Sequence, residues 1–243
     1  QFFALFDDID KLQQTTCLEV TLKNGARYEL PFVDVEWETV EMPTEYHDRI
    51  HFKISDLMLT TLRNLIKPEL QCIWIDEKGA VSCDIISACI SNQVKSTHPF
   101  LLPLDVQELV EGKTASVNAE TDMLFISGHD FNIAVKKPEV TDAWYDDLRE
   151  MVLGDAGFVS ASGLSESLAR LEIFNDYVSF DGERAIAGSN YEPFAFKDLG
   201  SNFYEIAKLE RLLSVSKDIG ELNNNLVLRN EGSLFLLSAM EEA

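Results

Sequence analysis

Residues 113–138 read KTASVNAETDMLFISGHDFNIAVKKP, and this stretch decides the fold predicted for the chain. It contains three runs rich in apolar residues: Thr114–Asn118, Met123–Ser127 and Phe131–Val135. The polar segments 120–122 and 128–130, which carry Asp, Thr and Gly, separate these runs. Short apolar runs bounded by turn residues predict antiparallel strands joined by hairpins. We therefore expect three consecutive strands that close a structural unit.

The same order of elements occurs more than once. An extended run, an amphipathic helix, hairpins, a second helix and further hairpins occupy His51–Pro138 and again Phe158–Met240. The strands predicted at Cys17–Leu22 and Arg27–Val33 flank Asn24-Gly25, a strong hairpin signal, so residues 1–40 match the second half of a third copy. Repetition with few helices and many short strands predicts an α+β fold built from modules.

The repeat also sets the expected domain boundaries. They are a truncated N-terminal module at 1–47, a module at 48–137, a connector at 138–157 and a C-terminal module at 158–243. Because Gln1 falls in the middle of the pattern, we expect a further segment to precede it.

Composition limits the class of protein. The 243 residues include 20 basic and 42 acidic side chains, a net charge of −22, which opposes non-specific binding of nucleic acid if spread evenly. The apolar runs are too short for a membrane span, and the four cysteines lack metal or redox spacing. We expect reduced thiols and a cytoplasmic protein with no membrane partner.

Three predicted helices carry basic residues opposite their apolar stripes. Helix 56–67 places Arg63 and Lys67, together with Thr60, on its solvent face. Helix 163–174, with Ser162 as its expected N-cap, exposes Arg170. Helix 203–217 is expected to bury its leucines and to expose Lys208 and Arg211. Each face could simply solubilise its helix, so only convergence of several faces would indicate an anionic ligand.

No catalytic motif stands out. The chain lacks G-x-S-x-G, Walker A and G-x-G-x-x-G patterns, and its four histidines, His47, His51, His98 and His129, do not show metal-ligand spacing. The Asp-rich segments 7–10 and 146–147 lack the alternation of a calcium loop. We expect a protein that is not an enzyme, with no cofactor and no metal.

Taken in order, these elements resemble the DNA sliding clamps, and among them the bacterial beta clamp. Residues 113–138 resemble the closing hairpins of a clamp domain, and EVTDAW at 139–144 resembles the interdomain connector. The final SLFLLSAMEEA at 233–243 is similar to the last strand and short acidic tail of such proteins. The acidic ending, and the absence of a Gly-His-Arg-like stretch at Asp84–Ala88, favour a viral or phage member.

The resemblance implies a ring that encircles duplex DNA, with helices lining the lumen, and that tethers the replicative DNA polymerase after opening by a clamp loader. The residues expected to face DNA are Arg63, Lys67, Arg170, Lys208 and Arg211. An apolar pocket for partner peptides is expected at Leu62, Ile85, Ile86, Pro138, Val140, Leu237 and Met240. Three modules per chain would close the ring as a homodimer, which the partial third module favours over a homotrimer. Such a protein would act in the cytoplasm of a bacterial or phage-infected cell.

Two alternatives remain open from sequence. The charge of −22 would also suit an acidic interaction protein or DNA-mimic inhibitor that occupies a DNA-binding partner. An enzyme whose site is assembled from scattered residues would instead require a deep pocket lined by perturbed acids or histidines.

Overall fold

The computed structural model describes residues 9–14, 17–22, 27–31, 40–61, 68–138 and 144–240, and the chain divides into two compact units, Gln1–Glu41 and Met42–Ala243. In the N-terminal unit, β1 (Ile9–Gln14), β2 (Cys17–Leu22) and β3 (Arg27–Pro31) form an antiparallel sheet in that order. Thr21 faces Arg27 across β2 and β3, so the predicted hairpin is confirmed, although its Asn24-Gly25 turn lies outside the described residues.

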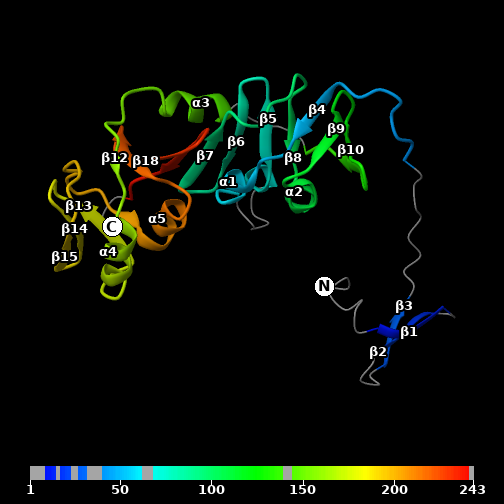
Figure 1. The fold of residues 1–243 in the computed structure, drawn as a ribbon, viewed down its shortest axis with the longest axis horizontal. Coiled ribbons are helices and arrows are strands. Elements are labelled where there is room, and N and C mark those ends of the chain that lie inside the picture. Colours follow the sequence, from blue (N-terminus) through cyan, green and yellow to red (C-terminus); the bar gives the residue numbers. More distant parts are fainter. Residues whose placement is uncertain are drawn as a thin grey trace. The chain divides into compact units, whose positions relative to one another are not determined.

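The larger unit begins with what we call the first module, β4 to β11 (Figure 1). Its elements are β4 (Asp48–His51), α1 (Ser55–Met58), a 3-10 helix (Pro68–Gln71), β5 (Ile73–Asp76), β6 (Gly79–Cys83), β7 (Ser87–Ser91), β8 (Phe100–Leu102), α2 (Leu104–Val110), β9 (Thr114–Asn118), β10 (Met123–Ser127) and β11 (Asn132–Lys136). The three strands predicted within residues 113–138 are therefore confirmed, with the last one shifted by one residue.

A helix, α3 (Trp144–Met151), leads to the second module, β12 to β19. The elements of this module are β12 (Val159–Ser160), α4 (Leu164–Leu171), β13 (Tyr177–Phe180), β14 (Arg184–Ala187), β15 (Asn190–Pro193), β16 (Tyr204–Glu205), α5 (Ile206–Leu213), β17 (Asp218–Leu222), β18 (Asn225–Asn230) and β19 (Ser233–Leu237).

The two modules share one topology. In the first, β4 pairs with the first strand of the β9-β10-β11 meander, and β8 pairs with the first strand of the β5-β6-β7 meander. In the second, β12 pairs with β17 of β17-β18-β19, and β16 pairs with β13 of β13-β14-β15. The predicted α+β fold of repeated elements is thus confirmed at the level of strand order, whereas the residue boundaries assigned to the domains stay a prediction.

The modules meet edge to edge. β19 pairs with β7 in antiparallel register from Ser233 opposite Ser91 to Leu237 opposite Ser87. This pairing produces an eight-stranded sheet with the order β12-β17-β18-β19-β7-β6-β5-β8. The backbone groups at these two strand edges are therefore satisfied by each other, which makes the junction part of the fold rather than a flexible hinge.

Helices cover the two faces of this sheet unequally. In Figure 1, α1, α2 and α5 lie on one side of the eight-stranded sheet and α3 lies on the other. Residues from both modules, including Leu57 of α1, Val106 of α2 and Leu209 of α5, belong to one continuous buried core. No helix in the described part of the chain is long and apolar enough to cross a membrane.

The connector contains a helix that the sequence interpretation did not anticipate. Tyr145 of α3 is buried and stacks on Trp74 with ring centroids 4.8 Å apart and an interplanar angle of 7°. Leu148 packs with Cys83 and Leu236 on the same face of the sheet. Arg149 pairs with Asp76, the last residue of β5, so α3 is held by both apolar and charged contacts.

The helix predicted at 56–67 is wrong in its extent, because α1 ends at Met58 and residues 59–61 form a turn, and its predicted surface is wrong at Thr60. Thr60 is fully buried. Its hydroxyl is satisfied inside the protein, because it donates to the Leu57 carbonyl at 3.2 Å and is hydrogen-bonded to Ser82 Oγ at 2.7 Å. Residues 62–67 lie outside the described residues. The cap predicted for the next helix is also wrong: α4 follows Gly163, with φ of 81°, and Ser162 makes no capping hydrogen bond.

Candidate functional site

A groove of about 520 Å³ lies at the junction of the two modules. The turn between β6 and β7 forms one wall, and α5 with the residues after β19 forms the other. Its lining residues are Asp84, Ile85, Ile86, Glu205, Ala207, Lys208, Arg211 and Met240. Apolar side chains with a few polar groups at the edge are typical of a site that binds a peptide or small molecule.

The β6–β7 turn presents its apolar side chains because Asp84 organises its backbone. Asp84 Oδ1 accepts hydrogen bonds from the N–H groups of Ile86 at 2.9 Å and Ser87 at 2.7 Å. This arrangement is an Asx turn, which reverses the chain without glycine. Ile85 is consequently exposed at the tip, and Ile86 is half-buried against the core. The turn therefore separates β6 from β7.

An ion pair connects the two walls of the groove. Lys208 Nζ of α5 contacts Asp84 Oδ2, and the two side chains are only 16% and 7% exposed. The expectation that Lys208 is exposed is therefore wrong, because a carboxylate from the other module covers its ammonium group. Separating two charged groups that are largely shielded from water would leave each charge uncompensated and would destabilise the fold. The pair therefore fixes the position of α5 against the β6–β7 turn.

The chain after β19 completes the second wall. Ser238 N–H donates to the Ile86 carbonyl at 2.8 Å, and Met240 N–H donates to the Phe203 carbonyl at 2.8 Å. These bonds place the half-buried Met240 beside α5, where it lines the groove. A flexible thioether in such a position adapts to apolar side chains of different shape.

The structure brings together only part of the predicted peptide pocket. Ile85, Ile86 and Met240 line the groove, whereas Leu237 is fully buried in β19 as part of the core. Pro138 ends a described stretch and does not line this groove, and Leu62 and Val140 lie outside the described residues. The sequence interpretation did not assign a role to Asp84. Its signal was the residue type itself, because aspartate often forms turns by accepting hydrogen bonds from the backbone two residues further on.

The residues predicted to face DNA differ in their exposure and in their ion-pair partners. Arg170 is exposed on α4 and donates two hydrogen bonds to the Glu192 carboxylate of β15, at 2.9 and 2.8 Å. This pairing raises the pKa of Arg170 and lowers the pKa of Glu192. Arg211 is exposed on α5 and makes no ion pair with a residue that the structure describes. Arg63 and Lys67 lie outside the described residues, and the DNA-facing role of all five cations stays a prediction.

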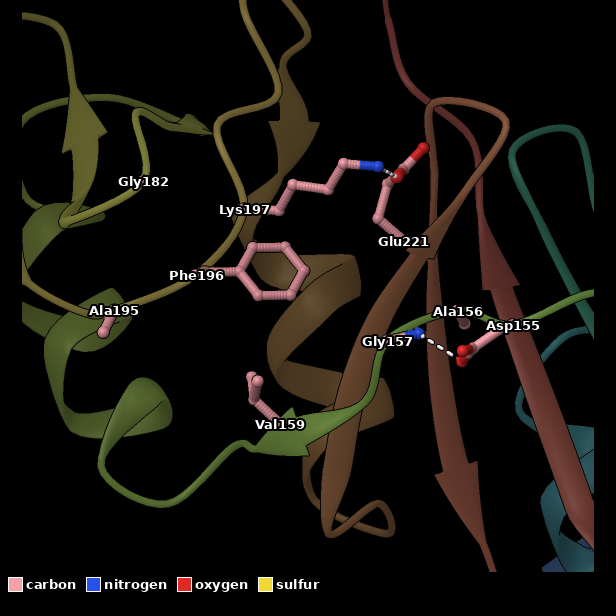
Figure 2. Close-up of a pocket in the computed structure, with 9 residues that line it drawn as sticks. All are labelled: Asp155, Ala156, Gly157, Val159, Gly182, Ala195, Phe196, Lys197 and Glu221. Atoms are coloured by element: carbon pink, nitrogen blue, oxygen red, sulfur yellow. Dashed lines mark hydrogen bonds and ion pairs between the residues drawn. The ribbon is translucent and has the colours of Figure 1, made fainter.

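A smaller pocket of about 350 Å³ lies within the second module (Figure 2). The segment from Asp155 to Val159 and the loop around Phe196 form its walls, and Lys197 pairs with Glu221 across its upper side. The Lys197 contact, against the opposing effect of burial, lowers the pKa of Glu221. Because the two charges neutralise each other and the remaining lining is mostly apolar, this pocket offers little chemistry to a ligand.

The repeated modules, the edge-to-edge sheet and the helices gathered on one face define the fold of the DNA sliding clamps. Within that class, the chain has the fold of the bacterial DNA polymerase III beta subunit. The subunit from Thermotoga maritima superimposes with a TM-score of 0.70 at 13% identity, covering 96% of this chain and 76% of that one. The Pseudomonas aeruginosa subunit gives 0.66 at 12%, covering 95% and 76%.

The beta subunit of Borrelia burgdorferi, solved in complex with a natural product, gives a TM-score of 0.63 at 15% identity and covers 94% and 74% of the two chains. No protein-family model and no curated protein sequence matches this chain. The likeness therefore lies in the fold, since the sequence identities to these three subunits are only 12 to 15%.

Proposed function

We propose that this chain is the subunit of a DNA sliding clamp, a non-enzymatic ring without a cofactor that encircles duplex DNA and tethers the replicative DNA polymerase. The observation that carries the proposal is the β7–β19 junction, where two modules of the same topology join by strand pairing. A repeated unit that joins its neighbour by sheet edges can continue that contact from one chain to the next and close a ring.

The equivalent edges for a contact between chains follow from the topology. β15 occupies in the second module the place that β7 has in the first, and within the described residues it is the last strand of its sheet. β3 ends a three-stranded meander as β19 does. We therefore propose that β15 of one chain pairs with β3 of another, in a homodimer rather than a homotrimer.

Exposed apolar residues after α4, a helix that contacts β15, support this interface. Ile173 and Phe174, which follow α4, are 78% and 62% exposed, and α4 packs against β15. Large apolar side chains gathered at a surface next to an unpaired strand indicate a contact with another protein. Burying these side chains in a second copy would add a hydrophobic contribution to the strand pairing.

The DNA-binding role rests on the helices that gather on one side of the sheet. Arg63, Lys67, Arg170, Lys208 and Arg211 are the proposed DNA-facing cations, and α4 contacts α5 so that two of the predicted faces lie on neighbouring helices. Contacts with phosphates alone carry no sequence preference, so a ring held by them could slide along the duplex.

The groove at the module junction is the proposed docking site for the polymerase and for the clamp loader. Ile85, Ile86 and Met240 would receive apolar side chains of a short peptide. This clamp would work in the cytoplasm of a bacterial or phage-infected cell, where DNA is replicated.

Light scattering combined with a DNA retention assay tests the proposal. The chain should have the mass of a dimer, and with its loader it should remain on nicked circular duplex and leave linearised duplex. Changing Ile173 and Phe174 to serine should shift the mass towards the monomer, whereas Leu153→Ser, at a residue 75% exposed in the connector, should not.

A protein that stays monomeric and ignores both forms of DNA would contradict the clamp role. That result would favour the acidic interaction protein or DNA-mimic inhibitor, which requires neither a ring nor affinity for duplex.

A further inference from the structure

Three metal-ligating side chains meet in the first module, away from the groove. His47 immediately precedes β4, His98 lies in the loop between β7 and β8, and Glu120 lies in the turn between β9 and β10. Their ligand atoms all lie within 4.8 Å of one another. The spacing of the four histidines along the sequence did not indicate this cluster, because the fold brings two of them together from distant segments.

The carboxylate of Glu120 approaches the Nε2 atoms of both imidazole rings. Its Oε2 is 3.0 Å from His47 Nε2, and its Oε1 is 3.7 Å from His98 Nε2. The ring centroids are 4.8 Å apart with an interplanar angle of 45°. Both ring nitrogens that face the carboxylate can act as ligands to the same ion.

One atom of the cluster lacks a hydrogen-bond partner. His47 Nε2 is buried and, despite the short distance to Glu120, makes no hydrogen bond of acceptable geometry within the described part of the chain. A buried polar atom without a partner is destabilising, and such atoms in native proteins require an explanation. A cation at this point would supply the missing interaction.

The second nitrogen of His98 is already oriented. His98 Nδ1 is hydrogen-bonded to Thr97 Oγ1 at 3.0 Å, and that hydroxyl lies 3.0 Å from the carboxylate oxygens of Asp48. The same carboxylate accepts a hydrogen bond from Ser96 at 2.8 Å. Histidines that bind metals usually use their other nitrogen in this way, since the contact fixes the orientation of the ring.

We propose that His47 Nε2, His98 Nε2 and one oxygen of Glu120 bind a zinc ion, with water as the fourth ligand. Two imidazoles and a carboxylate form a common zinc ligand set, with bonds of about 2.0–2.2 Å and therefore ligand atoms about 3.4 Å apart. The cluster must contract from its present 4.8 Å, which the exposed side chain of Glu120 permits.

The ion would join the start of β4 to two loops that are distant in sequence. Its effect would be on stability, because an ion that cross-links three segments stabilises the folded state in which the ligands are close together. This inference is independent of the proposed clamp function, since it concerns the stability of one module.

Zinc titration of the full chain tests the site. After treatment with a chelator, the protein should bind one Zn²⁺ in calorimetry, and Co²⁺ should give the visible absorption of a four-coordinate nitrogen and oxygen site. At a zinc concentration about 100 times the dissociation constant, the melting temperature should rise by about 5 to 10 °C.

Variants identify the ligands. His47→Ala, His98→Ala and Glu120→Gln should each lower the zinc affinity by at least about tenfold, because even the loss of an orienting partner has that effect. His51→Ala is the matched control, since His51 lies on the adjoining strand and its Nδ1 is hydrogen-bonded to Thr114 instead. All four cysteines remain in these variants.

The inference is overturned if the chain binds no zinc, or if the three variants bind it as tightly as the wild type. The latter result would assign the metal to the cysteines or to the other histidines. If an alanine variant fails to fold, Glu120→Gln decides alone, because it preserves the size of an exposed side chain and can be compared with wild type in the metal-free state.

Discussion

Replacing Arg149 with methionine tests what holds α3 on the sheet. Arg149 donates to both carboxylate oxygens of Asp76, each at 2.8 Å, and the two side chains are 14% and 12% exposed. Removing one member of a buried ion pair costs about 3–5 kcal/mol when the remaining charge has no other partner. Asp76 keeps hydrogen bonds from Trp74 Nε1 and from two backbone N–H groups, which reduces the expected loss.

We therefore expect Arg149→Met to lower the free energy of unfolding by about 2–3 kcal/mol at pH 7. For a unit of this size that loss corresponds to a melting temperature about 5 to 10 °C lower. Urea unfolding followed by circular dichroism measures the change, and tryptophan fluorescence reports the release of α3 because Trp74 stacks on Tyr145.

The control for this variant is Lys78→Met. Lys78 pairs with Asp146 of α3 at 2.9 Å, but both side chains are more than half exposed, so the pair contributes little. Its loss should leave the urea midpoint within experimental error. Equal destabilisation by the two variants would refute the view that the Arg149–Asp76 pair, rather than surface charge in general, holds α3.

The effect of Arg149→Met should also depend on pH. Burial alone would raise the pKa of Asp76, but the hydrogen bonds from Arg149 and Trp74 outweigh it and lower the pKa below its ordinary value. A lowered carboxyl pKa stabilises the fold above the ordinary pKa, and this contribution is lost as the pH falls towards the folded value. The difference between wild type and variant should be largest near neutrality and should narrow below about pH 4.

Four further outcomes are expected from substitutions elsewhere in the chain. Gly79→Ala should lower the free energy of unfolding by about 2–4 kcal/mol in urea unfolding, because φ is +138° and an added Cβ would lie 2.3 Å from a carbonyl oxygen of β7. Gly112→Ala, where nothing lies within 4 Å, should cost only about 1 kcal/mol. Met240→Asp should weaken capture of a polymerase peptide in fluorescence anisotropy without changing the oligomeric mass, and an unchanged affinity would exclude the groove. Lys208→Met should destabilise the chain more than Arg211→Met, since only Lys208 has a buried carboxylate partner.

Strands could be predicted from the sequence where a short run of residues alone determines them. β9 and β10 begin and end at the predicted residues, because alternating or continuous apolar runs between turn residues determine them within a few positions. The signals for α3 were also present in the sequence. Asp146 and Asp147 lie in its first turn and Arg149 in its last, as the helix dipole favours, but from the sequence these acids were considered only as possible calcium ligands.

The site was less predictable because its parts come from distant segments. Helical periodicity correctly placed Leu209 inside and Arg211 outside, yet it could not show that Asp84 of the other module covers Lys208. The β7–β19 pairing joins residues on opposite sides of the connector, and no local pattern specifies it. His47 and His98 meet for the same reason, since strand pairing rather than spacing brings their loops together.

The charge of the chain constrains how a clamp of this sequence could hold DNA. At −22, the protein as a whole repels phosphates, and among the predicted DNA-facing cations both Arg170 and Lys208 already pair with carboxylates. A paired cation contributes less to the salt-dependent attraction between protein and DNA, because its charge is already compensated. In the proposed clamp, retention on DNA would then come mainly from closure of the ring. The strand edge of β15 and the exposed residues Ile173 and Phe174 after α4, rather than the helix surfaces, would therefore set how long the protein stays on a circular duplex.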